Sequence, residues 1–313
     1  MPGRISPAFI LLIFASALLI FCPLAAHAAD GTEHELANCA AGQPAAEAIE
    51  GCTKALSSPD IDPPTRAKAF ITRGKAYITM HEWALAIADL KGAQNIEYSP
   101  NVAFAIAGLD STIGKNDDAI DELTKIINAG FPNALVFNRR GAVFQNAGKF
   151  DASIDDFNEA LFLNPRDLSS LNNRSAAYFK KGDYAAALKD LDSVLAINPK
   201  MPMALVNRCQ SLISDGKFDE GRASCDEAEK VDPNNYGILL GIGAAYYDAK
   251  HYEDAVRYYN RALQLMPNDP ELLYSRGLAQ SKLGNDSESK ADFSAAERIN
   301  PNIAAQMAAA GMK

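Results

Sequence analysis

Prolines recur at a fixed 34-residue interval along the second half of the chain, and this period constrains the fold more than any other feature. They stand at Pro165, Pro199, Pro233, Pro267 and Pro301. Glycines keep the same step at Gly114, Gly148, Gly182, Gly216 and Gly284, with Lys250 in the one place that is missed. A period shared by independent residue types indicates a stack of similar supersecondary units.

Seven repeats can be framed on this period: 67–99, 100–133, 134–167, 168–201, 202–235, 236–269 and 270–303. Each reads as a helix of about 14 residues, a turn that usually contains glycine, and a second helix. The eighth and twentieth positions hold only small residues, for example Gly141 and Ser153, so two helix backbones are expected to cross closely there. Since one hairpin cannot bury its apolar faces alone, the pattern predicts a continuous stack.

A 34-residue helix–turn–helix with these small positions, an aromatic residue near position 11 and a late proline resembles the tetratricopeptide repeat. Tyr77, Phe144, Tyr178 and Tyr246 occupy the aromatic position. The resemblance implies an all-α fold, a right-handed α-solenoid of tetratricopeptide-like helix–turn–helix repeats. In the second repeat Asp110 replaces the aromatic residue, so we expect this repeat to be bent or loosely packed.

The segments that flank the repeats are predicted to be short helical additions. Residues 29–66 resemble a leading partial hairpin, with Cys39 on its first helix and Pro63 and Pro64 in the exit from its second. Residues 304–313 are rich in alanine and predict a short capping helix, which a solenoid needs to cover its last apolar face.

The first 28 residues have the pattern of a secretory signal peptide. Arg4 precedes an apolar run over 8–21, Pro23 follows it, and Ala26-His27-Ala28 offers the small residues that a signal peptidase needs. We therefore expect cleavage after Ala28 and a periplasmic or secreted protein of the exported bacterial type. An uncleaved membrane anchor is the alternative.

The charge of the mature chain argues against polyanionic partners. Cleavage would remove Arg4 and no acid, which leaves 29 basic and 39 acidic residues. A net charge near −10 repels phosphate groups, so neither nucleic acid nor direct binding to anionic membranes is expected.

Four cysteines remain in the mature chain and form two local pairs, Cys39 with Cys52 and Cys209 with Cys225. An even number of paired cysteines in an oxidising compartment predicts two disulfides. Buried free thiols are the alternative.

An arginine at the seventh position is repeatedly matched by an aspartate 16 residues later. The pairs are Arg73 and Asp89, Arg140 and Asp156, Arg174 and Asp190, and Arg276 and Asp292. We interpret them as salt bridges from the first helix to the second of each hairpin. A ladder of anion-binding arginines is the alternative.

No pattern in the sequence indicates catalysis, a cofactor or a bound metal. The three histidines of the mature chain, His34, His81 and His251, are far apart and have no ligands at metal-binding spacing. We therefore expect a scaffold or adaptor and not an enzyme. Two alternatives are an exported enzyme subunit whose active site needs a partner and a membrane-tethered assembly factor of the envelope; self-association is left open.

The resemblance also implies where a partner would bind, because first helices line a concave groove in that family. Groove positions in the central repeats are Asn138, Arg139, Asn172, Asn173, Lys180, Asn207, Gln210 and Tyr247. Amide side chains can both donate to and accept from a peptide main chain, and Arg139 and Lys180 could hold a carboxylate. The expected partner is therefore a peptide or helix of another protein. The alternative is a solvated, unoccupied face.

Overall fold

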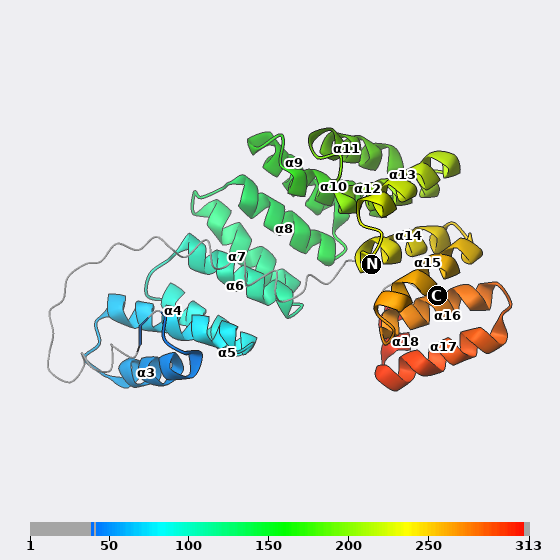
Figure 1. The fold of residues 1–313 in the computed structure, drawn as a ribbon. Coiled ribbons are helices and arrows are strands. Elements are labelled where there is room, and N and C mark those ends of the chain that lie inside the picture. The colour runs from blue at the N-terminus through cyan, green and yellow to red at the C-terminus, as the bar shows by residue number, and fades with distance from the viewer. Residues whose placement is uncertain (1–38, 41, 310–313) are drawn as a thin grey trace. The chain divides into compact units, whose positions relative to one another are not determined.

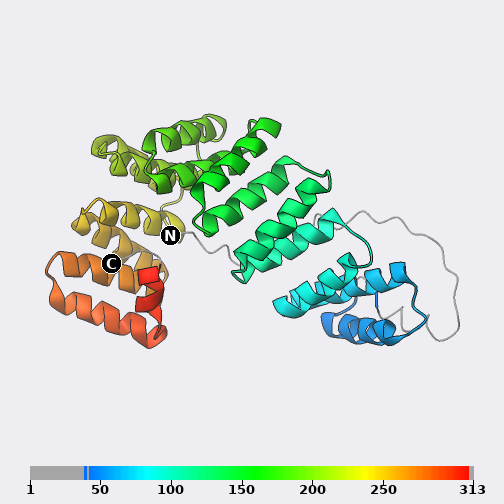
Figure 2. The same cartoon turned by 180° about the vertical axis from the view of Figure 1, so that it is seen from behind.

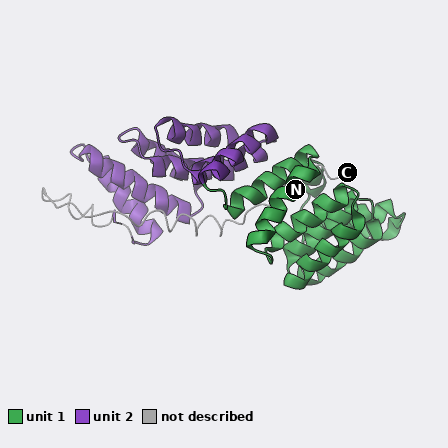
Figure 3. Ribbon diagram, turned by 90° about the horizontal axis from the view of Figure 1, so that it is seen from above, with its two compact units in different colours: residues 1, 164–313 green, residues 2–163 purple. Residues whose placement is uncertain are grey.

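The computed structural model describes residues 39–40 and 42–309, and within them it contains helices and no strand (Figure 1). The predicted all-α solenoid is confirmed. Two compact units are distinguished in Figure 3, which we call the N-terminal unit (described residues to 163) and the C-terminal unit (164–309). Figure 2 shows the same order of helices from the opposite side. No helix in the described part is long and apolar enough to cross a membrane.

The N-terminal unit contains α3 (Ala45–Ser57), α4 (Pro63–Thr79), α5 (Trp83–Gln94), α6 (Pro100–Thr112), α7 (Asn116–Asn128), α8 (Ala134–Asn146) and α9 (Phe150–Leu163). The C-terminal unit contains α10 (Leu168–Lys181), α11 (Tyr184–Ile197), α12 (Pro202–Ser214), α13 (Phe218–Val231), α14 (Tyr236–Asp248), α15 (Tyr252–Leu265), α16 (Pro270–Lys282), α17 (Asp286–Ile299) and α18 (Ile303–Ala309). From α4 onward, successive pairs of helices form antiparallel hairpins, and even-numbered helices up to α16 are the first helices of the repeats.

The small eighth position lets a large side chain of the second helix lie against the first. A Cβ atom added to Gly141 would come within 2.8 Å of the Phe157 ring, and one added to Gly243 within 2.7 Å of the Tyr259 ring. Such distances leave no room for any side chain. The close helix crossing that the sequence predicts is therefore set by a ring stacked directly on a bare helix backbone.

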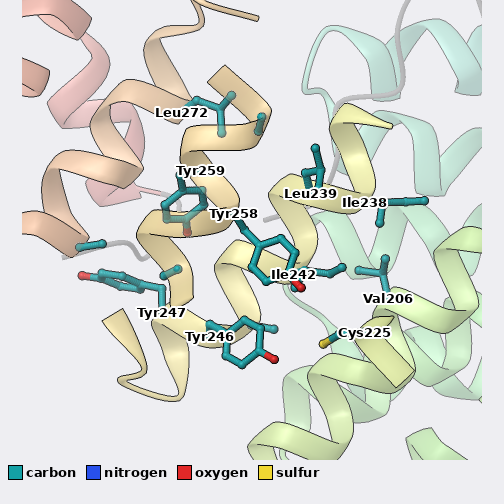
Figure 4. Packing of buried hydrophobic residues seen from close by; sticks show 14 of the residues in the cluster. Val206, Cys225, Ile238, Leu239, Ile242, Tyr246, Tyr247, Tyr258, Tyr259 and Leu272 are labelled. Carbon is teal, nitrogen blue, oxygen red and sulfur yellow. The ribbon is translucent and has the colours of Figure 1, made fainter. Parts of the chain in front are cut away.

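In the C-terminal unit a tyrosine-rich cluster fills the space between α14 and α15 (Figure 4). The rings of Tyr246 and Tyr258 are stacked with centroids 5.7 Å apart, and Tyr259 is fully buried. Ile242 also lies in this cluster, at the position where other repeats carry the paired arginine. The sixth repeat therefore replaces the charged pair by apolar and aromatic packing.

The turn between the helices of a hairpin requires a left-handed residue. Gly114, Gly148 and the equivalent glycines have φ near +80°, as the sequence pattern suggested. His81 and Lys250 adopt the same conformation, with φ of 61° and 64°, although L side chains disfavour it. The turn geometry is therefore kept even where glycine is absent.

The structure corrects the prediction for the second repeat. Ile106 and Leu109 of α6 and Leu123 of α7 are fully buried, so this repeat is well packed. Asp110 is also fully buried, and within the described residues neither carboxylate oxygen has a hydrogen-bond partner. The nearest cation is Lys91, whose Nζ lies 3.9 Å from Oδ2. The carboxyl group thus takes the place of the aromatic ring without disrupting the packing.

The leading segment also differs from the prediction. Pro63 and Pro64 are the first two residues of α4, and Asp62 caps this helix by accepting a hydrogen bond from the Thr65 amide. Proline is tolerated there because the first helical N–H groups have no acceptor within the helix. Cys39 lies in a bend and not in a helix.

The signal peptide predicted for residues 1–28 lies outside the described residues, as do residues 29–38 and 310–313. At the C-terminal end α18 buries Ile303 and Met307 against the core of the last repeat.

Candidate partner-binding face

The four predicted arginine–aspartate pairs come together in one geometry. The guanidinium Nε and Nη2 of each arginine donate to the two carboxylate oxygens of its aspartate at 2.6–2.8 Å; this holds for Arg73, Arg140, Arg174 and Arg276. The aspartate side chains are only 5–8 % exposed. Since these arginines already hold a buried carboxylate, we interpret them as internal fasteners and not as an anion-binding ladder.

The same arginines also reach the preceding hairpin. In the C-terminal unit, Arg276 Nη1 donates to Asn260 Oδ1 at 2.7 Å. Arg208 has no aspartate within its own repeat and instead bonds to Asp192 of the preceding one at 3.0 Å. These contacts, which the sequence analysis missed, link the hairpins of Arg276 and Arg208 to the hairpins before them.

Both cysteine pairs lie at disulfide distance. The Cα atoms of Cys39 and Cys52 are 4.5 Å apart, and those of Cys209 and Cys225 are 5.1 Å apart. All four side chains are buried. Cys209 and Cys225 occupy the positions that hold Gly243 and Tyr259 in the next repeat, so a covalent link takes the place of ring packing there.

In the C-terminal unit, most of the predicted groove residues are bonded within the protein. Asn207 Nδ2 donates to Asn172 Oδ1, and Gln210 Nε2 donates to the carbonyl oxygen of Gly241, both at 3.1 Å. Tyr247 is 9 % exposed and belongs to the hydrophobic cluster, which corrects its assignment to an open groove.

The two remaining groove residues of this unit are placed differently. Asn173 is partly buried, and Lys180 is exposed in the last turn of α10. The assignment of Asn173 and Lys180 to a groove therefore stays a prediction. The amide-rich face is therefore largely used for holding α10, α12 and α14 together.

The N-terminal unit offers a different surface on α8. Asn138 and Arg139 are both partly buried. The Arg139 guanidinium carbon lies 5.9 Å from the centroid of the Phe104 ring on α6. Its buried Nε has no hydrogen-bond partner within the described residues, and burial lowers the pKa of this guanidinium. Arg139 is thus a poorly hydrated cation in contact with an aromatic ring.

A second such cation, Lys75, was missed by the sequence analysis. It stands at the ninth position of the first repeat, on α4, and is partly buried. Its ammonium group makes no ion pair or hydrogen bond with the described residues, and burial lowers its pKa. The groove positions of the family, applied to the first repeat as well as the central ones, would have identified it.

We call the groove positions of α4, α6 and α8 the N-terminal groove face. It consists of Ile71, Thr72, Lys75, Ile78 and Thr79; Phe104, Ala105, Gly108, Ser111 and Thr112; and Asn138, Arg139, Ala142, Gln145 and Asn146. The face holds two cations and no acid, although acids outnumber bases 39 to 30 in the whole chain.

No group of three or more His, Cys, Asp or Glu side chains in the described residues could hold a metal ion.

Family models match the repeats directly. Models of the tetratricopeptide repeat match residues 138–202, 178–240 and 270–303, and a TPR repeat model matches 243–284. No curated protein sequence matches the chain significantly.

Solved structures share the fold at low sequence identity. A tetratricopeptide repeat protein from Parabacteroides merdae ATCC 43184 has a TM-score of 0.66 and 18 % identity, covering 75 % of this chain and 93 % of that one. A thermophilic TPR protein of Thermus thermophilus has a TM-score of 0.50 and 18 % identity, covering 59 % and 99 %. The Cut9–Hcn1 hetero-tetramer of the APC/C has a TM-score of 0.53 and 15 % identity, covering 75 % and 52 %. The two helices of a hairpin cross closely at small residues, and four family models match between residues 138 and 303. This chain therefore belongs to the tetratricopeptide repeat family.

Proposed function

We propose that this protein is an exported scaffold or adaptor that holds a peptide segment or a helix of another protein against its N-terminal groove face. The observation that carries the proposal is the pair of partly buried cations, Lys75 and Arg139, that lack a carboxylate partner within the described residues. Placing a charge in a poorly hydrated site costs free energy unless a partner compensates it. A bound segment would supply that partner.

The family membership supports the general class of function, since tetratricopeptide repeat proteins bind protein or peptide partners. Among the described residues, the arginine–aspartate pairs are bonded inside the hairpins, and no group of three or more His, Cys, Asp or Glu side chains could hold a metal ion. We therefore propose no enzymatic activity for the isolated chain. An enzyme subunit completed by a partner would show hydrolase or transferase activity only after the partner is added.

Export is supported by the pattern of residues 1–28 and by two cysteine pairs at disulfide distance. Mass spectrometry of the N-terminus of the protein from its native host tests this part. A mature chain that begins at Ala29 fits export with cleavage. A retained N-terminus would favour the membrane-tethered assembly factor instead.

Site-specific photo-cross-linking tests the binding face. A benzophenone amino acid at Thr79, an exposed residue of the N-terminal groove face, should give a discrete adduct with a partner in cells. The same group at Ala88, which is exposed on the second helix α5, is the matched control. Adducts of equal yield at both positions, or none at Thr79, would count against this face as the binding site.

A further inference from the structure

The second helix of the fifth repeat, α13, packs on its neighbours through small residues. Those that it buries are Gly221, Ser224, Cys225 and Ala228. Its two large apolar residues are not buried, since Phe218 is 48 % exposed and Val231 is only partly buried. The corresponding helices α9 and α11 bury Phe157 and Leu191 completely. Because the free energy of apolar burial follows the area removed from water, packing holds α13 less strongly than those helices.

The fifth repeat also lacks the salt bridge found inside other hairpins. Its two pair positions hold Arg208 and Ser224, and Arg208 donates instead to Asp192 of α11. The buried Ser224 hydroxyl donates to the carbonyl oxygen of Leu205 on α12 at 3.3 Å, a long bond between neutral groups. Since hydrogen bonds between charged groups are stronger than neutral ones, this contact does not replace a bidentate arginine–aspartate pair.

Helix α17 shows what compensates for a helix that packs through small residues. The residues that it buries are Ser289, Asp292 and Ala296. However, Arg276 holds Asp292 with two hydrogen bonds. The ring of Phe293 also lies directly over the bare backbone of Gly277. Helix α13 has neither an arginine–aspartate pair nor a ring at these positions, so its attachment to α12 depends on another link.

That link is the cysteine pair that joins the middle of α12 to the middle of α13. The side chains of Cys209 and Cys225 are fully buried, their Cα atoms are 5.1 Å apart, and 16 residues separate them along the chain. A disulfide across such a loop stabilises mainly by restricting the unfolded chain. This contribution disappears when the bond is reduced, whereas reduction leaves the salt bridges and stacked rings of the other repeats unchanged.

The helices on either side of α13 have contacts that do not involve it. Besides the arginine bond from α12 to α11, Gln210 of α12 donates to the carbonyl oxygen of Gly241 on α14. Glu229 of α13 accepts hydrogen bonds from Arg261 and Tyr258 of α15. The Glu229 and Arg261 side chains are 28 % and 34 % exposed, so water can replace the bond between them when α13 moves. Helix α13 can therefore leave α12 while α11, α12 and α14 stay connected.

We infer that α13 is a redox-controlled element, docked on α12 while Cys209 and Cys225 are joined and released when they are reduced. A dithiol reductant supplies two electrons and two protons: the sulfur–sulfur bond breaks, both cysteines become thiols, and the dithiol closes into its own disulfide. Release uncovers the apolar side of α12 around Ile213, which the backbone of Gly221 approaches closely in the docked state. This behaviour does not depend on where a partner binds, so it goes beyond the proposed function.

Amide hydrogen exchange of the full mature chain tests the inference. The oxidised protein should contain no free thiol, and its α13 amides should be protected. After dithiothreitol has freed all four thiols, we expect the α13 amides to exchange about a hundredfold faster, which is the factor by which a link across a loop of this length favours the closed state. The amides of α10, α11, α16 and α17 should keep their protection.

Variants separate this link from the other cysteine pair and from packing. Cys209→Ala/Cys225→Ala should show fast exchange in α13 without reductant, whereas Cys39→Ala/Cys52→Ala should keep α13 protected. Cys209→Gly/Cys225→Tyr copies the glycine and the tyrosine of the sixth repeat at these two positions. It should protect α13 whether or not the dithiol is present, because ring packing then replaces the covalent link.

Three results would overturn the inference: α13 amides that stay equally protected after full reduction, loss of protection throughout the C-terminal unit at once, or free Cys209 and Cys225 thiols in protein isolated from an oxidising compartment. The first would mean that packing alone holds α13. The second would mean that the link supports the whole unit and not one helix. The third would mean that the two cysteines are buried thiols and do not form the link.

Discussion

Burial of the acid decides how much each arginine–aspartate pair stabilises the protein. Asp292 is 8 % exposed and receives two hydrogen bonds from Arg276, whose side chain is 25 % exposed. Removing the arginine leaves a carboxylate that water cannot fully solvate, which costs about 3 kcal/mol. In the same unit, Asp192 is 63 % exposed, so water can replace its bond to Arg208 and the loss is less than about 1 kcal/mol.

We therefore expect Arg276→Ala to destabilise the last repeat several times more than Arg208→Ala destabilises the interface of the fourth and fifth. Repeat arrays unfold segment by segment, so amide hydrogen exchange of α16 and α17 is the appropriate measurement for the first variant, and that of α11 and α12 for the second. Adding Asp292→Asn to Arg276→Ala should recover part of the loss, because no buried charge then remains. Equal losses for the two arginines would refute the argument from burial.

Two further changes test features of the repeats that depart from the family pattern. Burial raises the pKa of Asp110, so the folded state holds a proton that the unfolded state has released; the free energy of unfolding should fall as pH rises from about 4. Asp110→Asn should flatten that dependence and stabilise the protein at pH 7 by about 1–3 kcal/mol. If thermal melts give the variant the same pH profile as the wild type, the Asp110 carboxyl group is hydrated and the argument is wrong. Lys250→Gly should raise the free energy of unfolding by about 0.5–1 kcal/mol in urea titrations, because Lys250 has a φ of 64°. A loss of stability instead would mean that the lysine side chain contributes more than its backbone strain costs.

The period of the sequence was sufficient to predict the helix pairs because small residues and turn glycines report local backbone requirements. The bare backbone at Gly141 and the left-handed turn at Gly148 are conditions that few residue types satisfy. Lys250 adopts the same left-handed turn conformation, so the 34-residue glycine pattern is interrupted there although the turn is kept. The start of α4 was missed for a related reason, since proline ends helices in the interior but Pro63 begins one in its first turn.

A binding face is harder to predict from the sequence, because it depends on which polar groups remain without partners after folding. Asn172, Asn207 and Gln210 looked like ligand-binding amides, and the structure shows them bonded to their own chain. The sequence does not distinguish Lys75 from other lysines on helices, because its partial burial appears only in the folded structure. Sequence spacing identifies the positions that face a groove, but the competition between internal and external partners is settled only by the side-chain contacts.

The same competition between internal and external partners is visible in the C-terminal unit. In the C-terminal unit, α12 and α14 approach so closely that a Cβ atom on Gly241 would lie 2.5 Å from Val206, and Gln210 joins the two helices across this contact. A side chain such as Gln210, whose amide is bonded across the two helices, has fewer hydrogen-bonding groups left for a ligand. In the N-terminal unit, Arg139 of α8 lies over the Phe104 ring of α6, and its Nε has no hydrogen-bond partner among the described residues. A polar group that is already bonded inside the protein therefore has less to gain from a partner than one that folding leaves without a bond, as with the Nε of Arg139.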